Sequence, residues 1–101
     1  MAFYIIGGEE LVIGFRFVGV PGTVVETVDE ARKAFQAATT SPEVMVLIIS
    51  EQVSAMIPRE VMDWQMSGTY PLLVEIPGIT GHMDGRASLI DSIREAVGLH
   101  V

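Results

Sequence analysis

Four strand-like segments, each followed by a stretch with helical features, constrain the fold of this chain more than any other feature. They cover residues 2–7, 23–27, 44–50 and 72–76. Residues 2–7 and 44–50 (VMVLIIS) are apolar at almost every position, which is typical of strands buried on both faces of a parallel sheet. Residues 23–27 (TVVET) are half polar, so this strand suits a position at the edge of the sheet.

The first two intervening segments carry helix-start signals. Residues 9–18 begin with two glutamates, whose negative charge complements the dipole of a helix N-terminus. Thr27 and Glu30 form a capping box, in which each side chain satisfies an amide at the start of the helix. We expect this second helix to run to about Thr39. Its apolar face is predicted to contain Val28, Ala31, Phe35 and Ala38.

The remaining helical segments follow the third and fourth strands. Residues 50–55 are predicted to form a single helical turn, and Pro58 suits the first position of a helix over residues 58–67. The predicted apolar side of that helix contains Val61, Met62, Gln65 and Met66, with Trp64 as a further large contact. A last helix is predicted over residues 86–97, with an apolar stripe made of Leu89, Ile93, Ala96 and Val97.

These elements alternate as βαβαβαβα along a chain of 101 residues that is 50% hydrophobic and 19% charged. The length predicts one domain over residues 1–101, large enough to bury a core of its own. Parallel strands joined by right-handed crossovers predict a small three-layer α/β sandwich, with flanking helices on both faces of a four-stranded sheet. The expected strand order is 2-1-3-4, with the second strand at one edge.

Charge and composition exclude several classes of partner. The formal net charge is −7, and one lysine with five arginines cannot assemble a basic patch for phosphate contacts. We therefore expect no nucleic acid partner and no adhesion to anionic lipid, whereas an acidic domain favours a basic protein partner. No apolar run reaches the ~18 residues that span a bilayer, so no direct membrane insertion is expected. The absence of cysteine and of a basic signal region fits a cytoplasmic protein.

Motifs for catalysis and metal binding are sparse. Glu9 and Glu10 follow the first strand, where a receiver domain places Mg²⁺-binding acids, but Ser50 stands where such a domain needs its phosphoacceptor Asp. The helix dipole explains the two glutamates better. The two histidines, His82 and His100, have no third ligand at a suitable spacing. We therefore expect no catalytic residue, no cofactor and no metal site.

Arg16 and the methionines each allow two interpretations. Arg16 either holds strand or loop carbonyls or reaches a partner, and the structural role is favoured. Most of the six methionines are expected to fill the core, although the later ones would also suit an adaptable contact surface. Ile90 broadens the stripe of the last helix, so that helix faces either the sheet alone or also a partner helix.

Four segments in order resemble a known family. They are residues 14–20 (GFRFVGV), 46–53 (VLIISEQV), 70–78 (YPLLVEIPG) and 93–98 (IREAVG). Together they resemble the F subunit of the V-type and A-type ATP synthases, in which the first segment reads GFRLAG. The resemblance covers essentially the whole chain, and it departs at residues 17–18, where Leu-Ala is commoner.

The resemblance implies a CheY-like fold and a non-catalytic role in the central stalk of a rotary ATPase that moves protons or sodium ions. Such proteins clamp the coiled-coil shaft, which is the D subunit of the stalk, and turn with it. They sit beside the other subunits of the V1 or A1 sector, peripheral to the membrane. The shaft is expected to meet one edge of the sheet and the last helix. With Arg16 added, the predicted partner-binding residues are Arg16, Thr23, Val24, Val25, Leu89, Ile90, Ile93 and Val97.

Two other hypotheses stay open at the level of sequence. A degenerate receiver-like signalling domain would bind a protein partner without phosphorylation, and Mg²⁺-dependent shifts near Glu9, Glu10 and Ser50 would support it. A small nucleotide or metabolite binder would require stabilisation by its ligand. Residues 7–8 (GG) do not complete the Gly-x-Gly-x-x-Gly fingerprint of dinucleotide-binding proteins, which counts against the latter.

Overall fold

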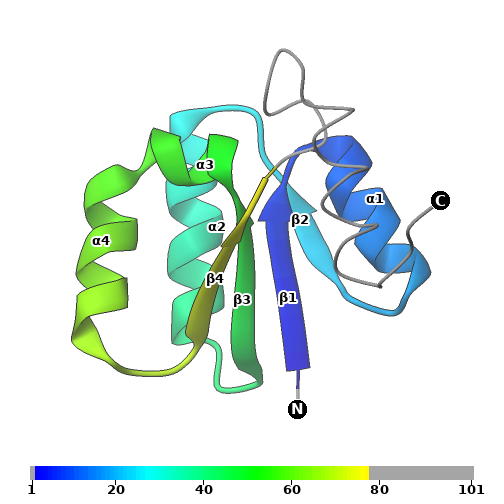
Figure 1. Cartoon of the computed structure of the whole chain (residues 1–101). Coiled ribbons are helices and arrows are strands. Elements are labelled where there is room, and N and C mark those ends of the chain that lie inside the picture. The colour runs from blue at the N-terminus through cyan, green and yellow to red at the C-terminus, as the bar shows by residue number, and fades with distance from the viewer. Residues whose placement is uncertain (1, 78–101) are drawn as a thin grey trace, which may run out of the picture.

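The computed structural model describes residues 2–77, so the helix predicted at residues 86–97 lies outside the described part of the chain. Four strands and four helices lie within this range in the predicted order, with α3 and α4 in succession between β3 and β4 (Figure 1). They are β1 (Ala2–Gly7), α1 (Glu9–Phe17), β2 (Gly22–Val24), α2 (Val28–Thr40), β3 (Val44–Ser50), α3 (Glu51–Met56), α4 (Pro58–Ser67) and β4 (Leu72–Ile76).

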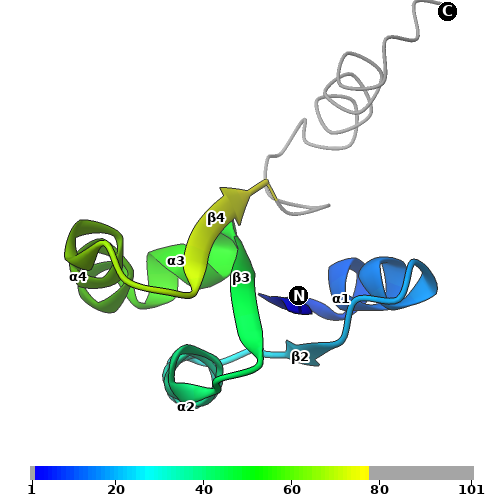
Figure 2. The same ribbon diagram turned by 90° about the horizontal axis from the view of Figure 1, so that it is seen from below.

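The four strands form one parallel sheet in the order β2-β1-β3-β4, which confirms the predicted topology. Helix α1 lies on one face of the sheet, and α2, α3 and α4 lie on the other (Figure 2). The architecture is the expected three-layer CheY-like α/β sandwich. Over the described residues, β2 and β4 each pair with a single neighbour and are the two edges of the sheet.

Two hydrophobic clusters, one on each face, hold the layers together. The larger cluster lies between the sheet and α2, α3 and α4, and the smaller one lies under α1. Alternation along the strands divides the residues between them, because successive side chains of a strand point to opposite faces. Ile5 of β1 and Ile48 of β3 belong to the α1 side, whereas Ile6, Leu47 and Ile49 belong to the other side.

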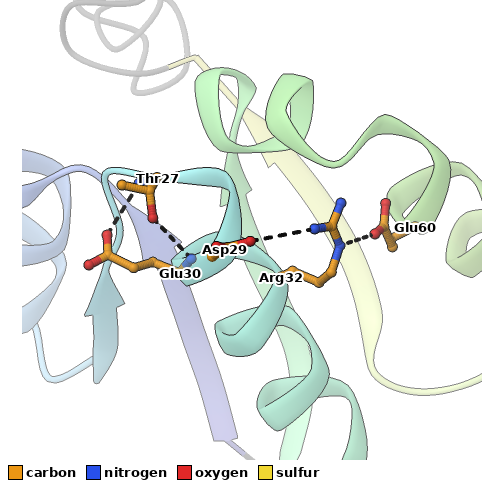
Figure 3. A network of polar contacts seen from close by, with 5 residues as sticks. All are labelled: Thr27, Asp29, Glu30, Arg32 and Glu60. Atoms are coloured by element: carbon orange, nitrogen blue, oxygen red, sulfur yellow. Dashed lines mark hydrogen bonds and ion pairs between the residues drawn. The ribbon is translucent and has the colours of Figure 1, made fainter.

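Helix α2 begins at the predicted capping box. The Thr27 hydroxyl accepts a hydrogen bond from the Glu30 amide at 3.1 Å, and the Glu30 carboxylate accepts one from the Thr27 amide at 3.2 Å (Figure 3). The predicted apolar face is correct for Ala31, Phe35 and Ala38, which are buried. It is wrong for Val28, which is exposed because the helix enters the core only after its first turn.

The predicted orientation of α4 is wrong by part of a turn. Val61 and Trp64 face the core, spaced by three residues, whereas Met62 and Met66 are exposed, Met66 at 79%. Trp64 fixes the rotation of the helix, because its ring packs edge-on against Phe35 with centroids 6.3 Å apart. The expectation that most methionines fill the core therefore fails for Met62 and Met66.

Candidate interaction surface

The segment 14–20 forms the end of α1 and the turn that follows it. Gly19 has a φ of 88°, and its amide donates to the Arg16 carbonyl at 3.0 Å. The Val20 amide donates to the Phe15 carbonyl, also at 3.0 Å. These two bonds make a Schellman motif, with glycine in the left-handed position and an apolar contact between the residues at its ends. The motif turns Val20 and Phe15 into the smaller core.

The same turn leaves an apolar surface on the outside of α1. Phe17 is 86% exposed, and Ile13, one helical turn earlier, and Val18 are also exposed. Arg16 is exposed beside them, and its guanidinium forms no hydrogen bond or ion pair with any residue in the range 2–77. Single exposed hydrophobic residues are common, but three close together at the end of one short helix, two within α1 and one at its C-cap, are typical of a contact site. The favoured structural role of Arg16 thus has no support from a side-chain bond in this part of the chain.

Strand β2 lies beside α1 at the same edge of the sheet (Figure 1). It spans three residues instead of the predicted five, because Thr27 is already the cap of α2. Val24 is exposed, Thr23 is half-buried with its hydroxyl hydrogen-bonded to the Tyr4 hydroxyl, and Val25 is buried in the larger cluster. We call the exposed residues of this region the α1–β2 edge, which comprises Ile13, Arg16, Phe17, Val18 and Val24.

A close backbone approach holds β2 against β1. The Ile5 amide donates to the Pro21 carbonyl, and the Val25 amide donates to the Gly7 carbonyl, both at 3.0 Å. A Cβ atom on Gly22 would lie 2.3 Å from the Ile5 Cγ2 and 2.4 Å from its carbonyl oxygen. Only glycine therefore fits this position without moving the strand.

The polar residues at the carboxyl end of the sheet have structural roles. Ser50 is buried, and its hydroxyl accepts a hydrogen bond from the Val53 amide at 3.2 Å, so it caps α3. Glu9 and Glu10 lie in the first turn of α1, as the dipole argument predicts. Among residues 2–77, no group of three or more His, Cys, Asp or Glu side chains could hold a metal ion. This arrangement gives no support to the receiver-like hypothesis.

One ion pair connects two of the helices on the covered face. The Arg32 guanidinium of α2 donates to the Glu60 carboxylate of α4 at 2.6 Å, and Asp29 lies 3.9 Å from the same arginine (Figure 3). The hydrogen bond from Arg32 lowers the pKa of Glu60, and the same bond raises the pKa of Arg32. The pair is solvent-exposed, so it links α2 to α4 without creating a chemical site.

Two shallow hollows lie along the seam between α4 and β4. The first, of about 290 Å³, is lined by residues 64–65 and 68–73, and the Trp64 indole donates to the Pro71 carbonyl at 2.8 Å beside it. The second, of about 370 Å³, includes Glu51 and Glu75 over an apolar floor that contains Val61. The lining of the first hollow contains neither a carboxylate nor a histidine, and the second adds the Ser54 hydroxyl to its two glutamates.

The structure brings together only part of the predicted partner-binding set. Arg16 and Val24 are exposed at one edge, whereas Val25 lies in the core behind it. Sequence reasoning missed Ile13, Phe17 and Val18 as surface residues, although the four-residue spacing of Ile13 and Phe17 is a helical signal. The other predicted residues, Leu89, Ile90, Ile93 and Val97, lie outside the described residues, as do His82 and His100.

Comparison with known proteins agrees with this architecture. The family model for the ATP synthase (F/14-kDa) subunit matches residues 3–97. The A-type ATP synthase F subunit of Thermoplasma volcanium is 30% identical over 73 residues, which are 72% of this chain and 70% of the relative. The corresponding protein of Pyrococcus furiosus is 26% identical over 108 residues, which cover 100% of this chain and 98% of the relative.

A solved structure shares the fold. The V-type ATP synthase F subunit of Archaeoglobus fulgidus superposes with a TM-score of 0.66 at 20% identity, covering 74% of this chain and 95% of that one. No helix among residues 2–77 is long and apolar enough to span a membrane. The chain therefore belongs to the family of ATP synthase F subunits, which are non-catalytic accessory subunits of the rotary ATP synthases.

Proposed function

We propose that this chain is a central-stalk rotor component of a V/A-type ATP synthase that moves protons or sodium ions, and that it binds the coiled-coil shaft formed by the D subunit. In this role it stiffens the shaft and couples or regulates ATP turnover and ion transport without catalysing either. The observation that carries the proposal is the α1–β2 edge, an exposed apolar surface on a rigid element of a chain in this family.

The chemistry of the α1–β2 edge suits a helical partner. Phe17, Ile13 and Val18 supply apolar area, and Arg16 supplies a cation that can pair with a carboxylate at the rim. Aromatic residues and arginine are the types most enriched at protein interfaces. A standard interface of ~800 Å² per partner is larger than this patch alone, so the proposal also includes the predicted stripe of the last helix. From that helix the proposal takes three stripe residues, Leu89, Ile93 and Val97, and the neighbouring Ile90.

Two further predicted residues, Thr23 and Val25, support the α1–β2 edge without contacting the partner themselves. Thr23 is tied to Tyr4, and Val25 is buried, so both hold β2 in place while Val24 makes the contact. The net charge of −7 favours a basic region on the partner and gives attraction over a distance of about one Debye length. We therefore expect association with the shaft to slow as the salt concentration rises.

The proposal also covers location and organisation. The chain forms one domain over residues 1–101 and is peripheral to the membrane on the cytoplasmic side, held there by the ATPase complex. Its partners are the D subunit and other subunits of the V1 or A1 sector, and neither nucleic acid nor the lipid bilayer is a direct partner. The acidic charge supports the last expectation, because phosphate groups would be repelled.

Co-expression of this chain with the shaft protein from the same genome, followed by gel filtration, tests the proposal. We expect a one-to-one complex at low salt. Arg16→Ala should reduce the yield of complex, whereas Arg59→Ala on α4, at the far side of the domain, should not. Separate elution of the two wild-type chains at low salt would contradict the proposed partner.

A further inference from the structure

The second hollow of the seam, of about 370 Å³, combines carboxylates with apolar side chains. It lies where α3, α4 and β4 meet, and we call it the α3–α4 hollow. It is on the opposite face of the sheet from α1, and so is separate from the α1–β2 edge (Figure 2). The lining residues that could recognise a ligand are Glu51 and Ser54 of α3, Val61, Met62 and Gln65 of α4, and Glu75 of β4.

The register of the sheet directs Glu75 towards the helices. Glu75 pairs with Ile49 of β3, and Ile49 belongs to the larger cluster under α2, α3 and α4. Residues in register on parallel strands point to the same face, so Glu75 faces the same side as Leu73, which packs against that cluster. A carboxylate thus occupies a helix-facing position in a strand that is otherwise apolar. Glu75 takes part in no ion pair with residues 2–77.

Ser54 adds a hydroxyl that has no partner within the described range. The residue is only 7% exposed, yet its hydroxyl forms no hydrogen bond with residues 2–77. Every fully buried side-chain oxygen or nitrogen in this range has a partner, so the Ser54 oxygen is open to the hollow that the residue lines. An enclosed hydroxyl without a hydrogen bond costs free energy, which a ligand that bonds to it would recover. This hydroxyl therefore points to a polar ligand in the hollow.

We propose that the α3–α4 hollow binds a lysine or arginine side chain presented by a basic segment of a partner protein. The carboxylates of Glu51 and Glu75 pair with the cationic head, and the Ser54 oxygen accepts one of its remaining hydrogen-bond donors. The aliphatic stem lies against Val61 and Met62, because long cationic side chains cover apolar surface while their charge stays in a polar site. This inference goes beyond the proposed function and does not depend on it.

The chemistry of the hollow and of its surroundings favours this occupant over others. The carboxylates repel phosphate groups and other anions. No group of three or more His, Cys, Asp or Glu side chains within residues 2–77 could hold a metal ion. A protein is favoured over a free organic cation because Met62 is 58% exposed beside the hollow and Met66, one turn further along α4, is 79% exposed. Methionines form adaptable contact surfaces, and the net charge of −7 attracts a basic partner.

Titration of the full-length chain with two synthetic peptides, followed by NMR, tests this inference. The probe is a short peptide with blocked termini that carries one lysine between leucines, and the control peptide carries acetyl-lysine instead, which has no charge. We expect the lysine peptide to shift the amide signals of Ser54, Val61 and Glu75 most, and to bind at least about tenfold more tightly than the control. Equal affinities for the two peptides, or no saturable binding of the lysine peptide, would overturn the inference.

A matched pair of substitutions separates the site from the overall charge. Glu75→Gln and Glu43→Gln each remove one negative charge from an exposed residue, but Glu43 precedes β3 at the opposite end of the sheet from the hollow. Glu75→Gln should weaken binding of the lysine peptide at least about fivefold, whereas Glu43→Gln should leave it unchanged. Equal losses for the two variants would mean that only net charge attracts the peptide, and would contradict the site.

Two further measurements address the hydroxyl and the source of the cation. Ser54→Ala should weaken the lysine peptide about two- to threefold without lowering the urea midpoint of unfolding, because the hydroxyl has no partner to lose within residues 2–77. A lower midpoint with unchanged affinity would give Ser54 a structural role instead and contradict its part in the site. Butylamine has the same cationic head without a peptide backbone, and binding as tight as that of the lysine peptide would assign the hollow to a free cation. None of these measurements includes the shaft protein, so their outcome is independent of the α1–β2 edge.

Discussion

The two faces of the sheet differ in how much of their apolar surface is buried by described elements. On the face under α2, α3 and α4, Leu47 and Ile49 are fully buried, and Trp64 and Phe35 fill the space between helices. On the α1 face, burial is complete only beneath α1, and Phe17 and Leu72 lie open on either side. The covered face therefore contains most of the burial that stabilises the fold, whereas the α1 face leaves large apolar side chains exposed.

The largest expected effect on stability contrasts two phenylalanines, one for each face. Phe35→Ala should lower the free energy of unfolding by about 3–5 kcal/mol, because it empties a buried site and removes the edge-on contact with Trp64. Phe17→Ala should change it by less than about 0.5 kcal/mol, because Phe17 is exposed. Urea denaturation of both variants measures the difference. Similar losses in the free energy of unfolding for the two variants would contradict the difference between the two faces.

The next largest effect concerns the attachment of β2. Gly22→Ala should destabilise the domain by about 1–3 kcal/mol, because the new methyl group overlaps Ile5 and pushes the edge strand away. Gly14→Ala is the control, since a Cβ there meets nothing within 4 Å and the residue lies inside α1. It should stabilise the isolated chain by about 0.5–1 kcal/mol through helix propensity. Thermal unfolding should therefore shift in opposite directions for the two variants.

A smaller effect is expected at the start of α2 on the covered face. Thr27→Ala removes the hydroxyl that accepts from the Glu30 amide, and should cost about 1 kcal/mol. Thr27→Ser keeps an accepting oxygen and should retain most of the stability. If both substitutions proved neutral in urea denaturation, the capping box would have no energetic role.

The smallest effect is a pH dependence from the ion pair between α2 and α4. Arg32 holds the pKa of Glu60 below its ordinary value of 4.5, so the folded state favours the carboxylate. The resulting stabilisation is present above the unfolded pKa and is lost as the pH falls through the lower folded pKa. Glu60→Gln should flatten this part of the stability profile, measured by urea denaturation between neutral and acidic pH. A steeper loss of stability in acid for Glu60→Gln would contradict the assignment.

Local patterns were sufficient to predict most of the fold. The apolar run of β3 and the capping box at Thr27 act through neighbouring residues, and both are found where predicted. Helix orientation was harder, because Met62 and Val61 are adjacent and both apolar. The contact of Trp64 with Phe35 decides which of them is buried. Phe35 belongs to a different helix, so no local pattern contains that contact.

The candidate site was predictable only in outline. The edge position of β2 followed from its half-polar sequence, but the burial of Val25 depends on the short length of that strand. The exposure of Phe17 follows from the Schellman turn, which directs Phe15 and Val20 inward and leaves the residues between them outside. From the sequence, Arg16 was predicted as a partner-binding residue of this segment, but its apolar neighbours Phe17 and Val18 were not.

The most direct test of the proposed shaft-binding surface is the affinity of this chain for the D subunit, measured by titration calorimetry with two matched substitutions. Phe17→Asp places a charge on the α1–β2 edge, and Met66→Asp places one at a similarly exposed apolar site on α4. We predict that Phe17→Asp weakens binding by about 30-fold or more, as expected for an interface anchor, while Met66→Asp leaves the affinity unchanged. Equal affinities for the two variants, or a loss confined to Met66→Asp, would contradict the assignment of the α1–β2 edge as the shaft-binding surface.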